Sequence, residues 1–193
     1  MKRVTKLALA LIATGLIATA SGGATFAAFA RTTQNDGDTY SAGTVTLSDD
    51  DAGSVMWDVT DQLPTSPGIV RCIRVTYTGS LAAGVRLYTT TASSALDPYL
   101  NITVEKGSMP VGTVFPNCAG FTPEATISPA GTVQAFKAAR TGWANGLAAA
   151  PGAQTSWTTG NSLVYRFTMQ MQDTFAAQGL TALVGLTWEA QNQ

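Results

Sequence analysis

Between Ser162 and Gln172, bulky apolar side chains take every second position of the chain. A period of two places alternate side chains on opposite faces of an extended strand, so one face of this stretch is predicted to be buried. The predicted buried set is Leu163, Tyr165, Phe167, Met169 and Met171, and the opposite set is Val164, Arg166, Thr168, Gln170 and Gln172.

Shorter runs of the same kind recur, separated by Gly, Pro, Asn and Asp residues that favour turns. The last run, Thr181–Ala190, is predicted to be a strand that lies antiparallel beside residues 162–172. Its predicted inward face is Ala182, Val184, Leu186, Trp188 and Ala190. The other predicted strands are residues 44–48, 55–59, 69–77, 84–90 and 101–105. Repeated short strands at this spacing predict an all-β fold, an antiparallel β-sandwich with long loops.

One region has a different composition. Residues 132–150 are rich in Ala, and Val133, Phe136, Lys137 and Arg140 recur at helical spacing. We therefore expect one short helix over residues 132–139, followed by a Gly-containing loop at residues 140–146. The helix is predicted to cover one end of the sandwich.

The N-terminus has the three parts of a secretory signal peptide. Lys2, Arg3 and Lys6 form the charged part, residues 7–20 form the apolar part, and small residues follow. The alternative is a retained membrane anchor, but a bilayer needs about 20 apolar residues, and Gly22–Gly23 interrupts this run. We expect a cleaved leader, no stable membrane span after cleavage, and a secreted protein that is released or held non-covalently at the cell surface.

Two positions fit the small-residue pattern of signal cleavage. One cut falls between Ala27 and Ala28, and the other falls before Arg31. The first divides the chain into a signal peptide at residues 1–27, a flexible arm at residues 28–39 and a sandwich domain at residues 40–193. Loss of the basic leader leaves acidic residues in excess, which argues against nucleic-acid binding because that needs a basic face.

The chain has two cysteines, Cys72 and Cys118. An even pair in an exported chain indicates a disulfide, which would stabilise the fold by about 4 kcal/mol for a loop of this length. Two buried free thiols are the alternative. A redox-active pair is not expected, because the spacing is far from Cys-x-x-Cys.

Residues with catalytic or metal-binding potential are scarce. The absence of histidine excludes a His-based triad and a His–Glu zinc protease. Asp49–Asp51, followed by Asp58 and Asp61, is the densest acidic cluster. Such oxygen-rich loops hold calcium in some proteins, but the spacing of known calcium loops is missing here, which favours a charged turn. We predict no enzyme activity, no cofactor and no resident metal.

The tryptophans leave two interpretations open. Exposed indole rings would form a sugar-binding surface, whereas buried ones would belong to the core or to an interface. The four residues are Trp57, Trp143, Trp157 and Trp188.

The stretch GGATFAAFARTTQNDGDTYSAGTVTLS, from Gly22 to Ser48, resembles the N-terminal signature of the TasA/camelysin family of bacterial biofilm-matrix and surface-fibre proteins. A small-Thr-aromatic-Ala-Ala-Phe segment at Gly23–Phe29 is followed by a polar arm. An aromatic, a small residue and Gly then precede an alternating strand; these positions are Tyr40, Ala42, Gly43, Val45, Leu47 and Ser48. Thr187–Ala190 also resembles the last strand of such proteins.

The resemblance implies a jelly-roll-like sandwich, processing by a dedicated signal peptidase, and assembly into fibres by donor-strand exchange. The partner would be a second copy of this chain or a related fibre subunit. In that mechanism the mature N-terminal arm pairs as an extra strand with a groove of the next subunit. Ala28 and Phe29 would be the apolar anchors at the tip of the arm, and a cut before Arg31 would remove both.

A structural fibre subunit is thus the first hypothesis, and two others stay open. The second is a secreted adhesin, a carbohydrate- or protein-binding module that uses exposed Trp or Tyr side chains. The third is a camelysin-like metallo-endopeptidase, an activity that the resemblance implies for some relatives. This chain has no His-Glu-x-x-His element, which argues against the third hypothesis.

Overall fold

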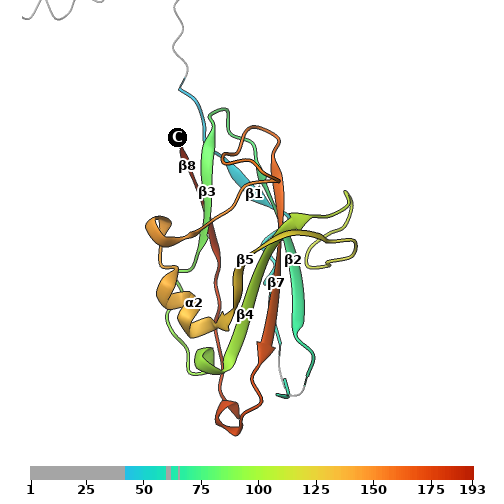
Figure 1. The fold of residues 1–193 in the computed structure, drawn as a ribbon, viewed down its shortest axis with the longest axis vertical. Helices are drawn as coiled ribbons and strands as arrows, with labels where there is room; N and C mark the ends of the chain where they lie inside the picture. Colours follow the sequence, from blue (N-terminus) through green and yellow to red (C-terminus); the bar gives the residue numbers. More distant parts are fainter. Residues whose placement is uncertain (1–41, 60–61, 65) are drawn as a thin grey trace, which may run out of the picture. The chain divides into compact units, whose positions relative to one another are not determined.

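Two antiparallel β-sheets pack face to face in the computed structural model, which describes residues 42–59, 62–64 and 66–193 (Figure 1). The larger sheet has the order β1-β2-β7-β4-β5, and the smaller sheet has the order β6-β3-β8. The predicted all-β sandwich with one short helix is confirmed for the described residues. The strands are β1 (Leu47–Asp49), β2 (Ile69–Tyr77), β3 (Ala83–Tyr88), β4 (Leu100–Ser108), β5 (Thr122–Thr132), β6 (Leu147–Ala148), β7 (Ser162–Met171) and β8 (Thr187–Asn192).

Alternate residues of both sheets form the core between the two layers. Leu163, Tyr165 and Phe167 of β7 are fully buried, as the alternation predicted. Val85 and Leu87 of β3 pack into the same cluster from the smaller sheet. The predicted inward face of β7 is therefore confirmed at these positions.

The order of the strands corrects one prediction. β7 and β8 are not neighbours, because β7 pairs with β2 and β4 while β8 pairs with β3. The connection between them crosses from the larger sheet to the smaller one and contains the short 3-10 turn η3 (Phe175–Ala177). A crossing connection places two strands that are adjacent in sequence on opposite layers.

Strand boundaries agree with the sequence to different degrees. β2 coincides with the predicted residues 69–77, whereas residues 55–59 form no strand and the last predicted strand begins only at Thr187. β5 and β6 were not predicted. β5 is a mostly exposed edge strand, so its sequence shows no clear alternation of apolar and polar residues. Pro123, Pro129 and Gly131 also resemble turn residues.

The helix α2 (Val133–Ala139) lies within one residue of its prediction. The hydroxyl of Thr132 caps its first turn by accepting a hydrogen bond from the backbone N–H of Ala135 at 3.1 Å. Its inward side chains are Val133, Phe136 and Lys137. Two further 3-10 turns, η1 (Asp97–Tyr99) and η2 (Trp143–Asn145), precede and follow it along the chain.

The predicted disulfide is present and joins Cys72 of β2 to Cys118, with 5.2 Å between the Cα atoms. It lies on the outer face of the larger sheet, where Val164 and Met109 are buried with Cys72, and Phe121 packs against them. The backbone N–H of Cys72 also donates to the carbonyl of Pro116 at 3.1 Å. The loop between β4 and β5 therefore covers this face, which explains why both faces of β7 are buried at Val164.

The predicted signal cleavage between Ala27 and Ala28 lies outside the described residues, as does the predicted arm at residues 28–39 with Ala28 and Phe29 as its anchors. Among the helices that the structure does describe, none combines the length and the apolar character needed to cross a membrane.

Candidate functional site

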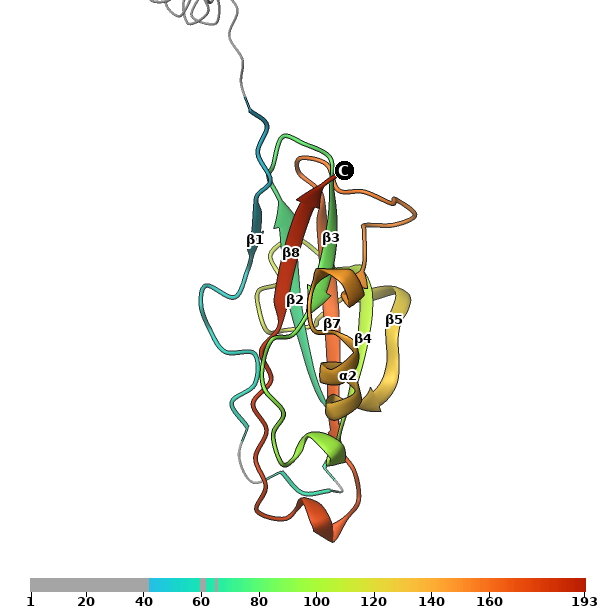
Figure 2. The same cartoon turned by 90° about the vertical axis from the view of Figure 1, so that its left-hand side faces the viewer.

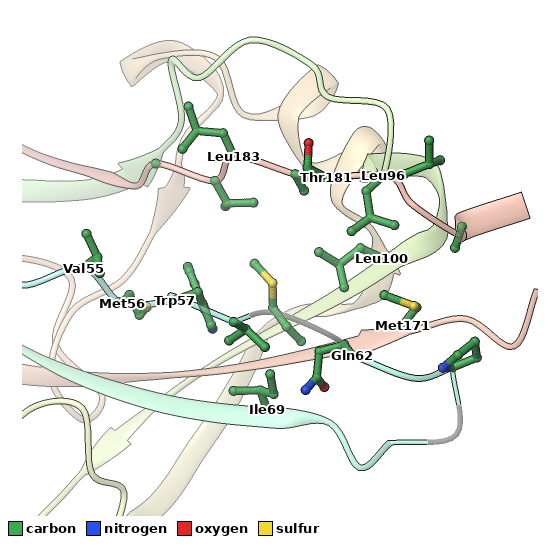
Figure 3. Close-up of a pocket in the computed structure, with 18 of the residues that line it drawn as sticks. Val55, Met56, Trp57, Gln62, Ile69, Leu96, Leu100, Met171, Thr181 and Leu183 are labelled. Atoms are coloured by element: carbon green, nitrogen blue, oxygen red, sulfur yellow. The ribbon is translucent and has the colours of Figure 1, made fainter.

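An apolar groove of about 1040 Å³ opens at the end of the sandwich, where the smaller sheet stops and the larger sheet continues. Its floor belongs to the inner face of the larger sheet and includes Ile69, Leu100 and Met171, which Figure 3 shows among the residues around the hollow. Two extended segments without regular strand structure, residues 51–59 and residues 179–186, form its walls. Figure 2 shows both segments on the same side of the sandwich.

The second wall, residues 179–186, is held along one edge only. The backbone N–H of Leu183 donates to Ser94 Oγ at 3.1 Å, and that of Gly185 donates to Thr91 Oγ1 at 2.9 Å. The carbonyl of Thr181 accepts from the N–H of Leu96 at 3.2 Å. Odd-numbered residues of this wall thus bond to the loop that follows β3.

A buried ion pair supports the same edge. Lys137 Nζ lies 2.7 Å from Asp97 Oδ2, and the two side chains are 3% and 0% exposed. Lys137 Nζ also donates to the carbonyls of Leu183 at 2.7 Å and Ala92 at 3.0 Å. All three N–H groups of the ammonium therefore have acceptors, which is the condition for a buried charge to be tolerated.

The opposite edge of this wall is free. In an extended chain, neighbouring residues direct their backbone N–H and C=O groups to opposite sides, so Ala182, Val184 and Leu186 point away from the bonded loop. Within the described residues, no hydrogen bond is made to the backbone groups of these three positions, and β8 pairs with β3 alone. The free edge therefore continues along β8 past Trp188.

Indole groups line the groove with unused donors. Trp57 packs edge-on against Phe167 at 5.7 Å between ring centroids, and Trp188 packs against Tyr165 at 5.5 Å. Trp57 Nε1, Trp188 Nε1 and the Tyr165 hydroxyl are buried without a hydrogen-bond partner among the described residues. Burial raises the pKa of Tyr165, so this hydroxyl stays protonated. Buried donors of this kind normally have acceptors, so these three groups are exceptions in the core beneath the groove.

The rim of the groove is apolar and exposed. Phe175 is 97% exposed, and Val55, Leu63 and Leu183 are also exposed around the opening. Large exposed apolar side chains that gather around one opening indicate an interaction site rather than an ordinary surface.

The acidic cluster predicted from the sequence forms a turn. Asp50 Oδ1 accepts from the N–H of Arg74 at 2.8 Å, and Asp51 Oδ1 accepts from that of Gly53 at 2.7 Å. Partial loss of solvation and the neighbouring Asp51 raise the pKa of Asp49. Among the described residues, no three Cys, Asp or Glu side chains are arranged to hold a metal ion.

The four tryptophans lie in three environments. Trp157 is fully buried in the core, so it is not available to a ligand. Trp57 and Trp188 line the groove, and Trp143 lies over the outer face of the smaller sheet, beside Arg86 and Gly84.

Sequence reasoning did not place the groove, because its walls are loops that meet through the fold. The apolar alternation of residues 182–190 was the one available signal for the second wall. No protein-family model and no curated protein matches this chain.

Proposed function

We propose that this protein is a secreted structural subunit of an extracellular matrix or surface fibre, and that it assembles by donor-strand exchange. The single observation that supports this most is the apolar groove beside the free edge formed by residues 182–186 and β8. An exposed strand edge is a template for another strand, and proteins that do not use such an edge generally protect it.

The groove has the two properties that strand addition needs. Backbone groups at Ala182, Val184 and Leu186 make no hydrogen bond within the described residues and could form a ladder. The apolar floor would receive every second side chain of the incoming strand.

The proposed occupant is the N-terminal arm of a second copy or of a related subunit. Ala28 and Phe29 would insert as apolar anchors, while the polar remainder of the arm, which contains three Thr and two Asp residues, would keep it soluble before insertion. Because the donor and the groove are different surfaces, the contact does not close and propagates into a filament. The resemblance of residues 22–48 to the TasA/camelysin signature supports the same proposal.

Electron microscopy of protein that begins at Ala28 tests this function. We expect concentration-dependent fibres, and monodisperse particles from a folded protein that lacks residues 28–38.

A variant in the groove tests the acceptor separately. Val184→Pro removes an N–H that faces the free edge and leaves the bonds of Leu183 and Gly185 in place, so it is expected to abolish fibres. Val184→Ala keeps the N–H and is the matched control, expected to polymerise. Normal fibres from the protein without the arm, or from a folded Val184→Pro protein, would contradict donor-strand exchange.

A further inference from the structure

The outer face of the smaller sheet carries a polar and aromatic surface that the proposed fibre contact does not use. The strand register places Arg86 opposite Glu189, and Gly84 opposite Gln191. Tyr88 follows Arg86 on the same face, since its inward neighbours Val85 and Leu87 are buried. We call these residues, together with Trp143 above them, the outer β3–β8 face.

Arg86 and Glu189 face each other across the strand pair but do not form an ion pair with each other. Opposite charges at such positions normally interact. The larger sheet offers a direct comparison: Arg166 and Glu105 are also cross-strand partners, and Arg166 Nη2 lies 2.7 Å from Glu105 Oε2. In the described part of the chain, the ion pairs are Arg166–Glu105, Lys137–Asp97 and Lys106–Glu124. The pair on the outer β3–β8 face is thus held apart.

Neutral partners hold both charged groups in place. The carboxylate of Glu189 accepts from the Tyr88 hydroxyl at 2.8 Å and from Gln191 Nε2 at 2.7 Å. These hydrogen bonds, with that of Gln191 the larger influence, lower the pKa of Glu189, so it is ionised at neutral pH. Arg86 Nη1 donates to the carbonyl of Ala144 at 3.3 Å. A fixed acceptor and a fixed donor therefore stand side by side with unused hydrogen-bonding capacity.

Trp143 adds a flat aromatic surface beside these two groups. The Arg86 guanidinium lies 5.2 Å from the centre of its ring. Asn145 fixes the turn that carries it, since Asn145 Oδ1 accepts from the N–H groups of Thr141 at 2.9 Å and Gly142 at 3.0 Å. The ring is half-buried, and because Arg86 lies over one of its faces, a ligand would pack on the part of the ring that Arg86 leaves uncovered.

We propose that the outer β3–β8 face binds a neutral polysaccharide. A sugar ring has an apolar C–H face, which packs on a large aromatic ring, and hydroxyls that both donate and accept hydrogen bonds. Glu189 would accept from hydroxyl groups and Arg86 would donate to them. Their opposite charges cancel, which disfavours a strongly anionic chain relative to a neutral one.

Isothermal titration calorimetry of the full chain with cellohexaose, chitohexaose and maltohexaose tests this proposal, with polygalacturonate as the anionic comparison. We expect saturable binding of at least one neutral hexasaccharide. Trp143→Ala and Glu189→Gln should each weaken it by about tenfold, the effect of losing one charged hydrogen bond or one aromatic contact. Trp143→Tyr should retain most of the affinity.

Glu105→Gln is the matched control, because it breaks the Arg166–Glu105 ion pair on the larger sheet and leaves the outer β3–β8 face unchanged. This variant should bind sugar like the original protein. Equal unfolding temperatures of the variants would exclude a folding defect as the cause. Three results would overturn the proposal: no heat with any neutral hexasaccharide, binding unaffected by Trp143→Ala and Glu189→Gln, or salt-sensitive binding of polygalacturonate alone. Self-association lost in these variants without sugar binding would instead assign the face to a protein contact.

Discussion

The ammonium group of Lys137 joins three parts of the chain that are distant in sequence. It belongs to α2, pairs with Asp97 in η1, and bonds to the carbonyl of Leu183 in the second wall of the groove. One buried charge therefore determines where this wall lies relative to the core.

Replacement of Lys137 by Met is expected to lower the free energy of unfolding by about 3–5 kcal/mol, because it leaves the carboxylate of Asp97 buried and unpaired. Urea denaturation followed by circular dichroism measures the change. The double variant Lys137→Met with Asp97→Asn should recover part of the loss, since it removes the second charge as well. Unchanged stability of the single variant would show that the pair does not support the fold.

At the scale of elements, the disulfide ties the β4–β5 loop to β2. Replacing Cys72 and Cys118 by Ala is expected to lower the free energy of unfolding by about 2–4 kcal/mol. A reducing agent should destabilise the original protein by a similar amount and leave the double variant unchanged. Denaturation curves with and without reductant provide the test, and equal midpoints for all four samples would contradict it.

Local sequence patterns were sufficient to predict the elements in which buried residues recur at the regular spacing of a strand or a helix. The apolar residues of β2 and β7 alternate over most of each strand, and burial departs from this pattern at Cys72 and Val164, so both strands were predicted from the sequence. α2 was predicted because its apolar residues recur at helical spacing. β5 was missed because an exposed edge strand does not need alternation, and its prolines resemble turn signals.

The same patterns could not predict contacts between residues that are distant in sequence. The partner of β8 depends on whether the preceding connection crosses between the sheets, which no short-range signal records. The groove likewise depends on Trp57 and Trp188, which are far apart in sequence and meet around Phe167. Only the disulfide could be predicted as a long-range contact, because two cysteines allow a single intramolecular pairing.

At the scale of the whole molecule, the proposed mechanism predicts that the groove binds the N-terminal arm of another copy in solution. A synthetic peptide with the sequence of residues 28–38 is expected to raise the unfolding temperature of protein that lacks those residues. The increase should saturate with peptide concentration, since a ligand stabilises the folded state that binds it. Differential scanning fluorimetry measures the shift.

A scrambled peptide and the Val184→Pro acceptor are the controls for this experiment, and neither should give a shift. Stabilisation by the scrambled peptide would point to nonspecific apolar binding, and no stabilisation by the native sequence would argue against the arm as the occupant.

The cross-link between Cys72 and Cys118 also has a mechanical meaning. The two cysteines are 46 positions apart, and the covalent bond closes everything between them into a loop. When the domain is pulled by its two ends, tension passes from β2 through the sulfur atoms and bypasses β3 and β4. Those strands then add nothing to the extensible length, so the oxidised domain would extend less on forced unfolding than the reduced domain.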